Sequence, residues 1–251
     1  MSAAKENEAQ FRFYEELNDF LPARKKKKAC MYQFRGKPSV KDAIEAMGIP
    51  HTEVDLILAN GESVGFDYHL RKGDQISVYP VFEGIDISPI VKLREKPLRR
   101  SSFICDVHLG RCARYLRMLG FDTLYENDYD DPKIVAISVT QNRILLTRDL
   151  KLLHAKVITH GYWIRSQNPH EQVREVVKRF DLHSQMKPFV RCITCNGLIK
   201  RVKKDDVIEQ LEPKTKKYYD EFYQCESCRR VYWNGSHYVE MKSAIEEFIR
   251  A

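Results

Sequence analysis

Two Cys-x-x-Cys pairs near the C-terminal end constrain the fold of this 251-residue chain more than any other feature. They are Cys192 with Cys195 and Cys225 with Cys228, and 29 residues separate the two pairs. A Cys-x-x-Cys turn directs two thiolates at one centre, and a second pair completes the four-thiolate shell of a structural Zn²⁺ site. An iron–sulfur cluster and two disulfides are the alternatives. Because a closed shell leaves no position for water, we expect a structural zinc.

Composition and charge narrow the class of protein. Hydrophobic residues make up 43% and charged residues 31% of the chain, which is typical of a globular protein. No apolar run approaches the roughly 20 residues of a membrane span, and MSAAKENEAQ lacks the apolar core of a signal peptide. We therefore expect a cytoplasmic protein without membrane contact, whose thiols stay reduced. The net charge of +7, with its basic excess after the first third of the chain, is compatible with a polyanionic partner.

Residues 1–87 are expected to form a small β-grasp domain. Ser39 is a natural N-cap for a helix that ends at Gly48, and Asn60-Gly61 indicates a turn between strands. Two strand-like segments precede this helix, and the later strands are expected at Val54–Leu58, Ser63–Phe66 and Gln75–Val81. Residues 88–100, SPIVKLREKPLRR, are predicted to be a basic linker, either a solvated tether or a strap that contacts phosphates.

Residues 101–187 alternate between strand and helix patterns, which predicts an α/β domain with a mostly parallel sheet. Strands are expected at Phe103–Cys105, Asp122–Tyr125 and Arg143–Thr147. Helices are expected after Asp106, at Asp131-Pro132 and at Asn168-Pro169. Residues 188–251 are expected to form a zinc ribbon, with a C-terminal helix at Ser243–Arg250 packing beside it.

Aspartates follow two of the expected parallel strands. Asp106 comes directly after the first strand and Asp149 after the third, while Asp130 and Asp131 precede a helix. Because parallel strands end at one sheet edge, Asp106 and Asp149 are expected to converge there, with Asp131 able to join them. Carboxylates select Mg²⁺ or Mn²⁺, which can activate water for attack on a phosphoryl group. Helix capping and turn formation explain the same residues without a metal.

Longer segments resemble a known nuclease family. DVHLGRCARYLRMLGFD, YDDPKIVAIS and RILLTRD, followed by the cysteine pairs with VYW and GSH, resemble the Mut-seven C-terminal RNase family. Its members are PIN-like nuclease domains fused to a zinc ribbon. The resemblance implies that Asp106, Asp131 and Asp149 occupy the PIN acidic positions, with Asp130 as a fourth. Glu126 and Asp128 compete for that fourth position.

The N-terminal third carries a second resemblance. SVKDAIEAMGIPHTEVDLILANGESV and LRKGDQISVYPVFEG are similar to the ubiquitin-like sulfur-carrier fold, which bacterial members of the nuclease family carry in front of the nuclease domain. The carrier family ends in Gly-Gly, whereas this unit continues through EGIDISP into the next domain. We therefore expect a docking module for a protein partner instead of a sulfur carrier.

Basic and aromatic residues suggest contacts with nucleic acid. Arg111, Arg114 and Arg117 recur every three residues on the helix after Asp106, near one face that either holds phosphates or is simply solvated. Arg148 adjoins Asp149, and Trp233 lies among basic residues of the ribbon, an arrangement suited to single-stranded or structured RNA. His237 is read as an RNA contact or a local hydrogen-bonding group.

The sequence therefore predicts a metal-dependent RNA phosphodiester hydrolase that cuts endonucleolytically. Two alternatives stay open: an RNA-binding module with an inactive acidic site, and a protein-interaction adaptor led by the ubiquitin-like unit.

Overall fold

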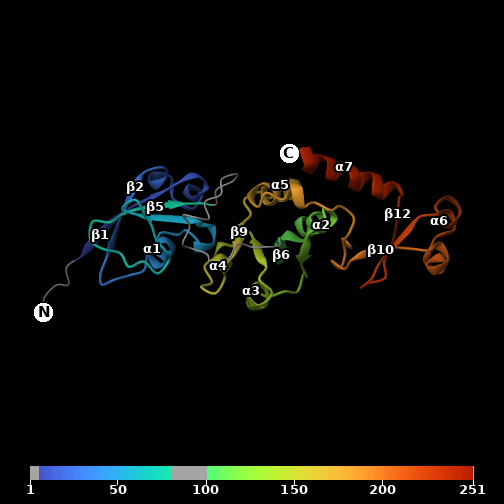
Figure 1. Ribbon diagram of the computed structural model, residues 1–251, viewed down its shortest axis with the longest axis horizontal. Coiled ribbons are helices and arrows are strands. Elements are labelled where there is room, and N and C mark those ends of the chain that lie inside the picture. Colours follow the sequence, from blue (N-terminus) through green and yellow to red (C-terminus); the bar gives the residue numbers. More distant parts are fainter. Residues whose placement is uncertain (1–5, 81–100, 251) are drawn as a thin grey trace. The chain divides into compact units, whose positions relative to one another are not determined.

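The computed structural model describes residues 6–80 and 101–250, which belong to two compact units. One unit comprises Met1–Arg99 with Asp149–Trp163, and the other comprises Arg100–Arg148 with Ile164–Ala251 (Figure 1). The assignment of residues 101–187 to one α/β domain stays a prediction. The expected linker at 88–100 lies outside the described residues. Among the described helices, none has the length and apolar character that crossing a membrane requires.

The N-terminal unit contains a five-stranded sheet in the order β2-β1-β5-β3-β4. Strand β1 is antiparallel to β2 and parallel to β5, and β3 is antiparallel to β5 and β4. This topology around one helix, α1, confirms the predicted β-grasp fold. The bounds are β1 Asn7–Phe13, β2 Ala29–Phe34, α1 Val40–Ala46, β3 Leu56–Ala59, β4 Glu62–Ser63 and β5 Gln75–Tyr79.

Local signals account for these elements. Ser39 Oγ accepts a hydrogen bond from Asp42 N at 3.1 Å, so it caps α1 as expected. Asn60 and Gly61 both have positive φ, +54° and +90°, which the tight turn between β3 and β4 requires. Alternate residues of β1, including Phe11 and Phe13, are buried in one core with α1.

Residues 149–163 pack within the same unit. They contain α4 (Leu150–Leu153) and β9 (Gly161–Trp163). His51 Nε2 lies 2.7 Å from the carbonyl oxygen of Ile158, and Glu53 Oε1 accepts a hydrogen bond from Trp163 N at 2.6 Å. The rings of Phe20 and Trp163 are 5.1 Å apart. This segment is therefore joined to the β-grasp by both polar and apolar contacts.

The second unit is built on parallel strands in the order β7-β6-β8. All four residues of β8 are buried, as its continuous apolar run predicts. Gly120 ends the helix α2 with φ +97°, and a Cβ there would lie 2.2 Å from the carbonyl oxygen of Lys187, so only glycine fits. The bounds are β6 Ser102–Cys105, α2 Gly110–Met118, β7 Asp122–Leu124, α3 Asp131–Thr140, β8 Ile144–Thr147 and α5 Pro169–Arg179.

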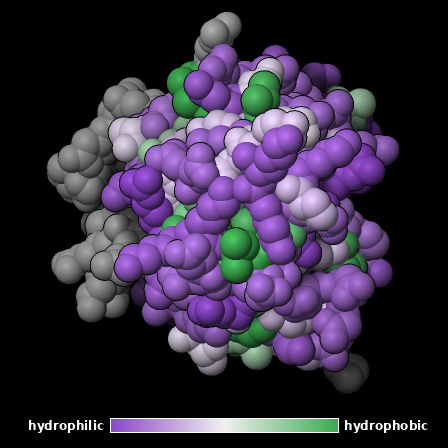
Figure 2. Space-filling model, turned by 90° about the vertical axis from the view of Figure 1, so that its right-hand side faces the viewer, coloured by the Kyte–Doolittle hydropathy of each residue, from purple (hydrophilic) through white to green (hydrophobic). Residues whose placement is uncertain are grey.

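The cysteine-bearing part forms an antiparallel sheet in the order β10-β11-β12 over a small apolar core of Val207, Leu211 and Phe222. Figure 2 views the surface on the side where β10 and α6 lie in Figure 1, and it is largely hydrophilic with small apolar areas. The bounds are β10 Ile199–Val202, α6 Pro213–Tyr218, β11 Phe222–Cys225 and β12 Val231–Trp233.

The C-terminal helix α7 (Ser236–Arg250) begins seven residues before the predicted start at Ser243. It also packs elsewhere than expected. Phe248 is 1% exposed, and its ring lies 5.6 Å from Tyr115 of α2 and 5.4 Å from His170 of α5. Helix α7 therefore extends over the α/β domain, as Figure 1 shows, and the expectation that Ser243–Arg250 packs beside the ribbon is wrong.

Candidate metal centre and acidic strand edge

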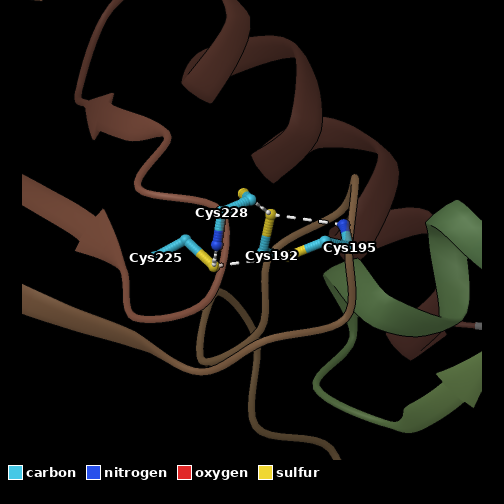
Figure 3. A group of neighbouring side chains, drawn as sticks. All are labelled: Cys192, Cys195, Cys225 and Cys228. Atoms are coloured by element: carbon cyan, nitrogen blue, oxygen red, sulfur yellow. Dashed lines mark hydrogen bonds between the residues drawn. The ribbon is translucent and has the colours of Figure 1, made fainter.

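The four cysteines come together as the sequence predicts. The Sγ atoms of Cys192, Cys195, Cys225 and Cys228 all lie within 4.8 Å of one another, in two loops that face each other (Figure 3). Both loops have the same backbone geometry. Cys195 N and Cys228 N each lie 3.5 Å from the Sγ atom three residues earlier, and the residues that follow, Asn196 and Arg229, both have positive φ.

The spacing of the sulfur atoms fits a metal ion. Tetrahedral zinc with thiolates at about 2.3 Å requires sulfurs about 3.8 Å apart. Cys192 and Cys228 are separated by 3.6 Å, and Cys195 and Cys225 by 3.4 Å. All four are free thiols in this structure, so the disulfide alternative is wrong here. The four cysteines can bind a metal such as zinc.

Tyr232 of β12 supports the first cysteine of this set. Its hydroxyl lies 2.9 Å from Cys192 Sγ. Burial raises the pKa of Cys192, but hydrogen bonds from Tyr232 and from backbone groups outweigh it and lower the pKa to about 6. A thiol with a lowered pKa is readily available as the thiolate that metals bind.

Arg117 has a different role from the predicted one. Its side chain is buried, and its guanidinium donates to the carbonyl oxygens of Thr123 at 2.8 Å, Thr194 at 2.7 Å and Tyr125 at 3.2 Å. Because Thr194 lies between Cys192 and Cys195, Arg117 holds the first cysteine loop against the α/β domain. The prediction that Arg117 shares an RNA-facing surface is therefore wrong.

Asn196 completes this attachment from the side of the cysteine loop. Its Oδ1 accepts from Thr123 N at 3.0 Å, and its Nδ2 donates to Asp122 Oδ1 at 2.7 Å. Burial raises the pKa of Asp122, but hydrogen bonds from Arg143 and Asn196 outweigh it and lower the pKa. The contacts of Asn196 and Asp122 were not predicted from the sequence. The buried position of Arg117 could have been predicted, because Arg117 lies four residues after Ala113 and thus on the apolar side of α2.

Asp106 occupies the carboxyl end of β6 and is 2% exposed. Its Oδ1 accepts from His108 N at 2.8 Å. Its Oδ2 accepts from Arg148 N at 2.9 Å and from the hydroxyl of Thr147. Donors from the end of the neighbouring strand β8 thus orient a buried carboxylate at this sheet edge.

The other predicted acidic residues act as helix caps or lie in a first helical turn. Asp130 Oδ1 accepts from Lys133 N at 2.9 Å, and Asp149 Oδ1 accepts from Lys151 N at 2.8 Å. Asp131 is exposed in the first turn of α3. Within residues 6–80 and 101–250, the four cysteines form a cluster of metal-binding side chains that is close enough to hold one ion. The predicted aspartates do not form a second cluster of this kind.

The predicted RNA contacts are spread over the second unit. Arg111 and Arg114 are exposed on α2, whereas Arg148 is half-buried directly after β8. Trp233 is half-buried and packs against the ribbon core. His237 is exposed, with Nδ1 at 3.4 Å from Glu240 Oε2.

Comparisons with known proteins agree with this architecture. Residues 101–245 match the Mut7-C RNAse domain, and residues 6–86 match the Mut7-C ubiquitin domain. No curated protein sequence matches the chain. The crystal structure of SAMP1 from Haloferax volcanii is similar with 17% identity and a TM-score of 0.26, over 32% of this chain and 100% of that chain. Because the first match covers more than half of its residues, the chain belongs to the Mut7-C RNAse domain family, which supports a nuclease-type function.

Proposed function

We propose that this protein is a metal-dependent ribonuclease that cuts RNA internally, at an acidic site formed by Asp106, Asp131 and Asp149, with Asp130 as a fourth acidic residue. The observation that carries the proposal is Asp106, a buried carboxylate at the carboxyl end of a parallel strand in a chain of an RNase family. Functional groups of parallel α/β sheets gather at that edge. Asp149 follows the end of β8 by two residues, which supports its inclusion.

The donor chemistry of these residues fits a hard divalent cation. A carboxylate offers about four lone-pair positions, and Asp106 uses three of them for the hydrogen bonds from His108, Thr147 and Arg148. Within the described ranges no basic side chain forms an ion pair with Asp106, and a buried carboxylate without a counter-cation is costly. Mg²⁺ or Mn²⁺ bound there would supply an activated water and stabilise charge on the phosphoryl oxygens.

The protein's own groups position the reactants. The hydrogen bonds to Asp106 fix the direction of its carboxylate before any ligand arrives, which is the preorganisation that catalysis needs. We propose that Arg148, whose backbone N already contacts Asp106, directs its side chain to the scissile phosphate. The free cysteines suit a reducing compartment, so we place this activity in the cytoplasm.

Cleavage of labelled RNA by the full chain, with Mn²⁺ and without added divalent cation, tests the proposal. Asp149→Asn is the sharper variant, because asparagine caps a helix as well as aspartate does and the fold should be preserved. We expect it to reduce the cleavage rate at least about 100-fold. Asp205→Asn, an exposed aspartate of the ribbon, is the matched control and should cut as the wild type does.

Two results would contradict the proposal. Cleavage that survives both Asp106→Asn and Asp149→Asn would come from a contaminant, and binding without cleavage in any divalent metal would identify an RNA-binding module. Internal cutting is checked with a circular RNA, which an endonuclease linearises and an exonuclease leaves intact.

The N-terminal unit is proposed to dock a protein partner. Its β-grasp fold and its match to the Mut7-C ubiquitin domain support this role. Co-purification with immobilised residues 1–87 is not a suitable test, because that fragment lacks residues 149–163, which pack on it. The full chain should be used as bait instead.

A further inference from the structure

Three adjoining hollows lie between the ribbon, α2 and the first turns of α7. Their volumes are about 330, 440 and 250 Å³, and Ile193 and Met241 line all three. We call them together the ribbon groove. At one end it is lined by Tyr223, Trp233 and Tyr238, and at the other by Arg111 and Arg114. It therefore joins an aromatic end to a basic end.

The aromatic end offers flat apolar surfaces that are only partly covered. Tyr223, Trp233 and Tyr238 are all half-buried. Tyr238 is supported from behind by Phe189, with ring centroids 4.7 Å apart. A ring held in place by a neighbour loses little entropy when a second flat ring stacks on it, and any nucleobase can be that second ring.

The basic end carries positive charge that the protein itself does not neutralise. Arg111, Arg114 and Arg230 are exposed, and across residues 6–80 and 101–250 no acidic side chain pairs with them. Arg191, in contrast, is paired with Asp122 at 3.4 Å and donates to Asn196 O. The acidic side chain in the lining is Glu240, which lies beside His237.

We propose that the ribbon groove binds a single-stranded RNA segment, with unpaired bases on Tyr223, Trp233 and Tyr238 and phosphates on Arg111, Arg114 and Arg230. The proposal rests on the proposed function in taking RNA as the ligand, and it adds the class of RNA. Paired bases expose only their edges, so they cannot stack on these rings. Alternating flat apolar and cationic surfaces match the alternation of base and phosphate along a single strand.

Docking of the cysteine loop gives the groove its shape. Ile193, which lines all three hollows, lies between Cys192 and Cys195, and the adjacent carbonyl of Thr194 is held by Arg117. The first cysteine loop, α2 and α7 therefore each contribute to the lining of the groove. In this arrangement the ribbon helps to bind single-stranded RNA and takes no part in the cleavage reaction.

Binding of a fluorescein-labelled oligouridylate to the full, zinc-loaded chain tests the proposal, measured by fluorescence anisotropy in buffer without added divalent cation. Tyr238→Leu should weaken binding about 10-fold, because one stacking surface is lost. Tyr218→Leu is the matched control, since Tyr218 is 67% exposed on α6 and does not line the groove. Tyr238→Phe keeps the ring and should bind as the wild type does, which separates stacking from damage to α7.

The basic end is tested by measuring how the affinity for RNA depends on salt concentration. Arg114→Gln should reduce the slope of log affinity against log salt by about 0.7, the value for one phosphate contact on a single strand. Arg201→Gln removes an exposed arginine that is paired with Glu221 and lies outside the groove, and it should leave the slope unchanged.

The fluorescence of Trp233 measures binding in the groove directly. The chain has two tryptophans, so Trp163→Phe leaves Trp233 as the only one. Its emission should be quenched by oligouridylate and unchanged by an abasic oligonucleotide of the same length. Equal affinity for duplex RNA, equal affinity for the abasic strand, or wild-type binding by Tyr238→Leu would each overturn the proposal.

These outcomes are distinguishable from failure of the nuclease proposal. Cleavage by the wild type together with unimpaired binding by Tyr238→Leu refutes the groove alone. Quenching and weakened Tyr238→Leu binding without cleavage in any metal refute the nuclease alone. Displacement of oligouridylate by an acidic peptide, with no quenching by RNA, would identify a protein ligand and refute the groove proposal.

Discussion

Arg117 is a buried charged residue that joins two parts of the second unit. It is 3% exposed, and carbonyl oxygens from β7, from the loop after it and from the cysteine loop surround its guanidinium. Burial lowers its pKa, which shows that the charge is held at a cost. Arginine is suited to this place because its planar fork can satisfy several acceptors at once.

Replacing Arg117 should therefore destabilise the second unit. Arg117→Met fills a similar volume but leaves several buried carbonyl groups without donors, so we expect a loss of about 3 kcal/mol in the free energy of unfolding. Arg114→Met, one turn away on the exposed side of α2, should change it by less than about 0.5 kcal/mol. Urea denaturation of both variants is the measurement, and equal losses would show that the Arg117 contacts are unimportant.

Tyr232 supplies a second prediction at this scale. Tyr232→Phe removes the hydroxyl that contacts Cys192 Sγ and should weaken zinc binding about 10- to 100-fold, the usual effect of losing an outer hydrogen bond at a metal site. Competition with a chromogenic chelator measures it. Tyr223→Phe changes the cross-strand neighbour of Tyr232 and should retain zinc as the wild type does.

At the scale of elements, the sequence predicted best where the signal is local. The apolar run of β8, the cap of α1 and the Cys-x-x-Cys turns are properties of a few adjacent residues, and each was found. The predicted start of α7 at Ser243 was wrong, because the helix begins at Ser236. A longer apolar pattern at helical spacing runs through α7 and indicates the observed helix. Its members are Tyr238, Met241, Ile245 and Phe248.

The packing of α7 can be tested with two adjacent residues. Phe248 is 1% exposed and Ile249 is 53% exposed. Phe248→Ala should lower the free energy of unfolding by about 3–5 kcal/mol, because it removes a buried ring and leaves a cavity. Ile249→Ala should change it by less than about 0.5 kcal/mol. Calorimetry of the two variants would refute this packing if they melted alike.

At the scale of the whole molecule, contacts between residues far apart in the sequence could not be predicted, and the acidic residues are an example. The position of Asp106 at a strand end follows from the alternation of strands and helices. The donors that orient it, Thr147 and Arg148, come from a strand about forty residues away, and no local pattern connects them. The same holds for residues 149–163, whose assignment to the N-terminal unit depends on contacts distant in sequence.

His51 gives the N-terminal unit a dependence on pH. Burial and then the charge of Lys41 lower its pKa below 6.5, although Glu45 and the Ile158 carbonyl act in the opposite direction. The unfolded chain therefore binds a proton more readily than the folded one. The stability that His51 contributes is fully present above about pH 6.5, its pKa in the unfolded chain, and is lost as the pH falls through the pKa of the folded state.

The test is the melting temperature between pH 7.5 and about 5. The wild type should lose stability over this range, and His51→Gln should lose less of it. His69→Gln, in the same unit, should follow the wild type. A profile of His51→Gln that coincides with the wild type would assign the effect to other groups.

Because residues 149–163 return to the N-terminal unit, the chain passes between the two units more than once. The chain enters that unit again after Arg148 and leaves it after Trp163. A cut at the border between the two family matches would thus leave Ile158 and Trp163 without Phe20, His51 and Glu53. We therefore expect the ubiquitin-like part to be less stable when it is separated from residues 149–163. We expect the two parts to be inherited, expressed and folded as one.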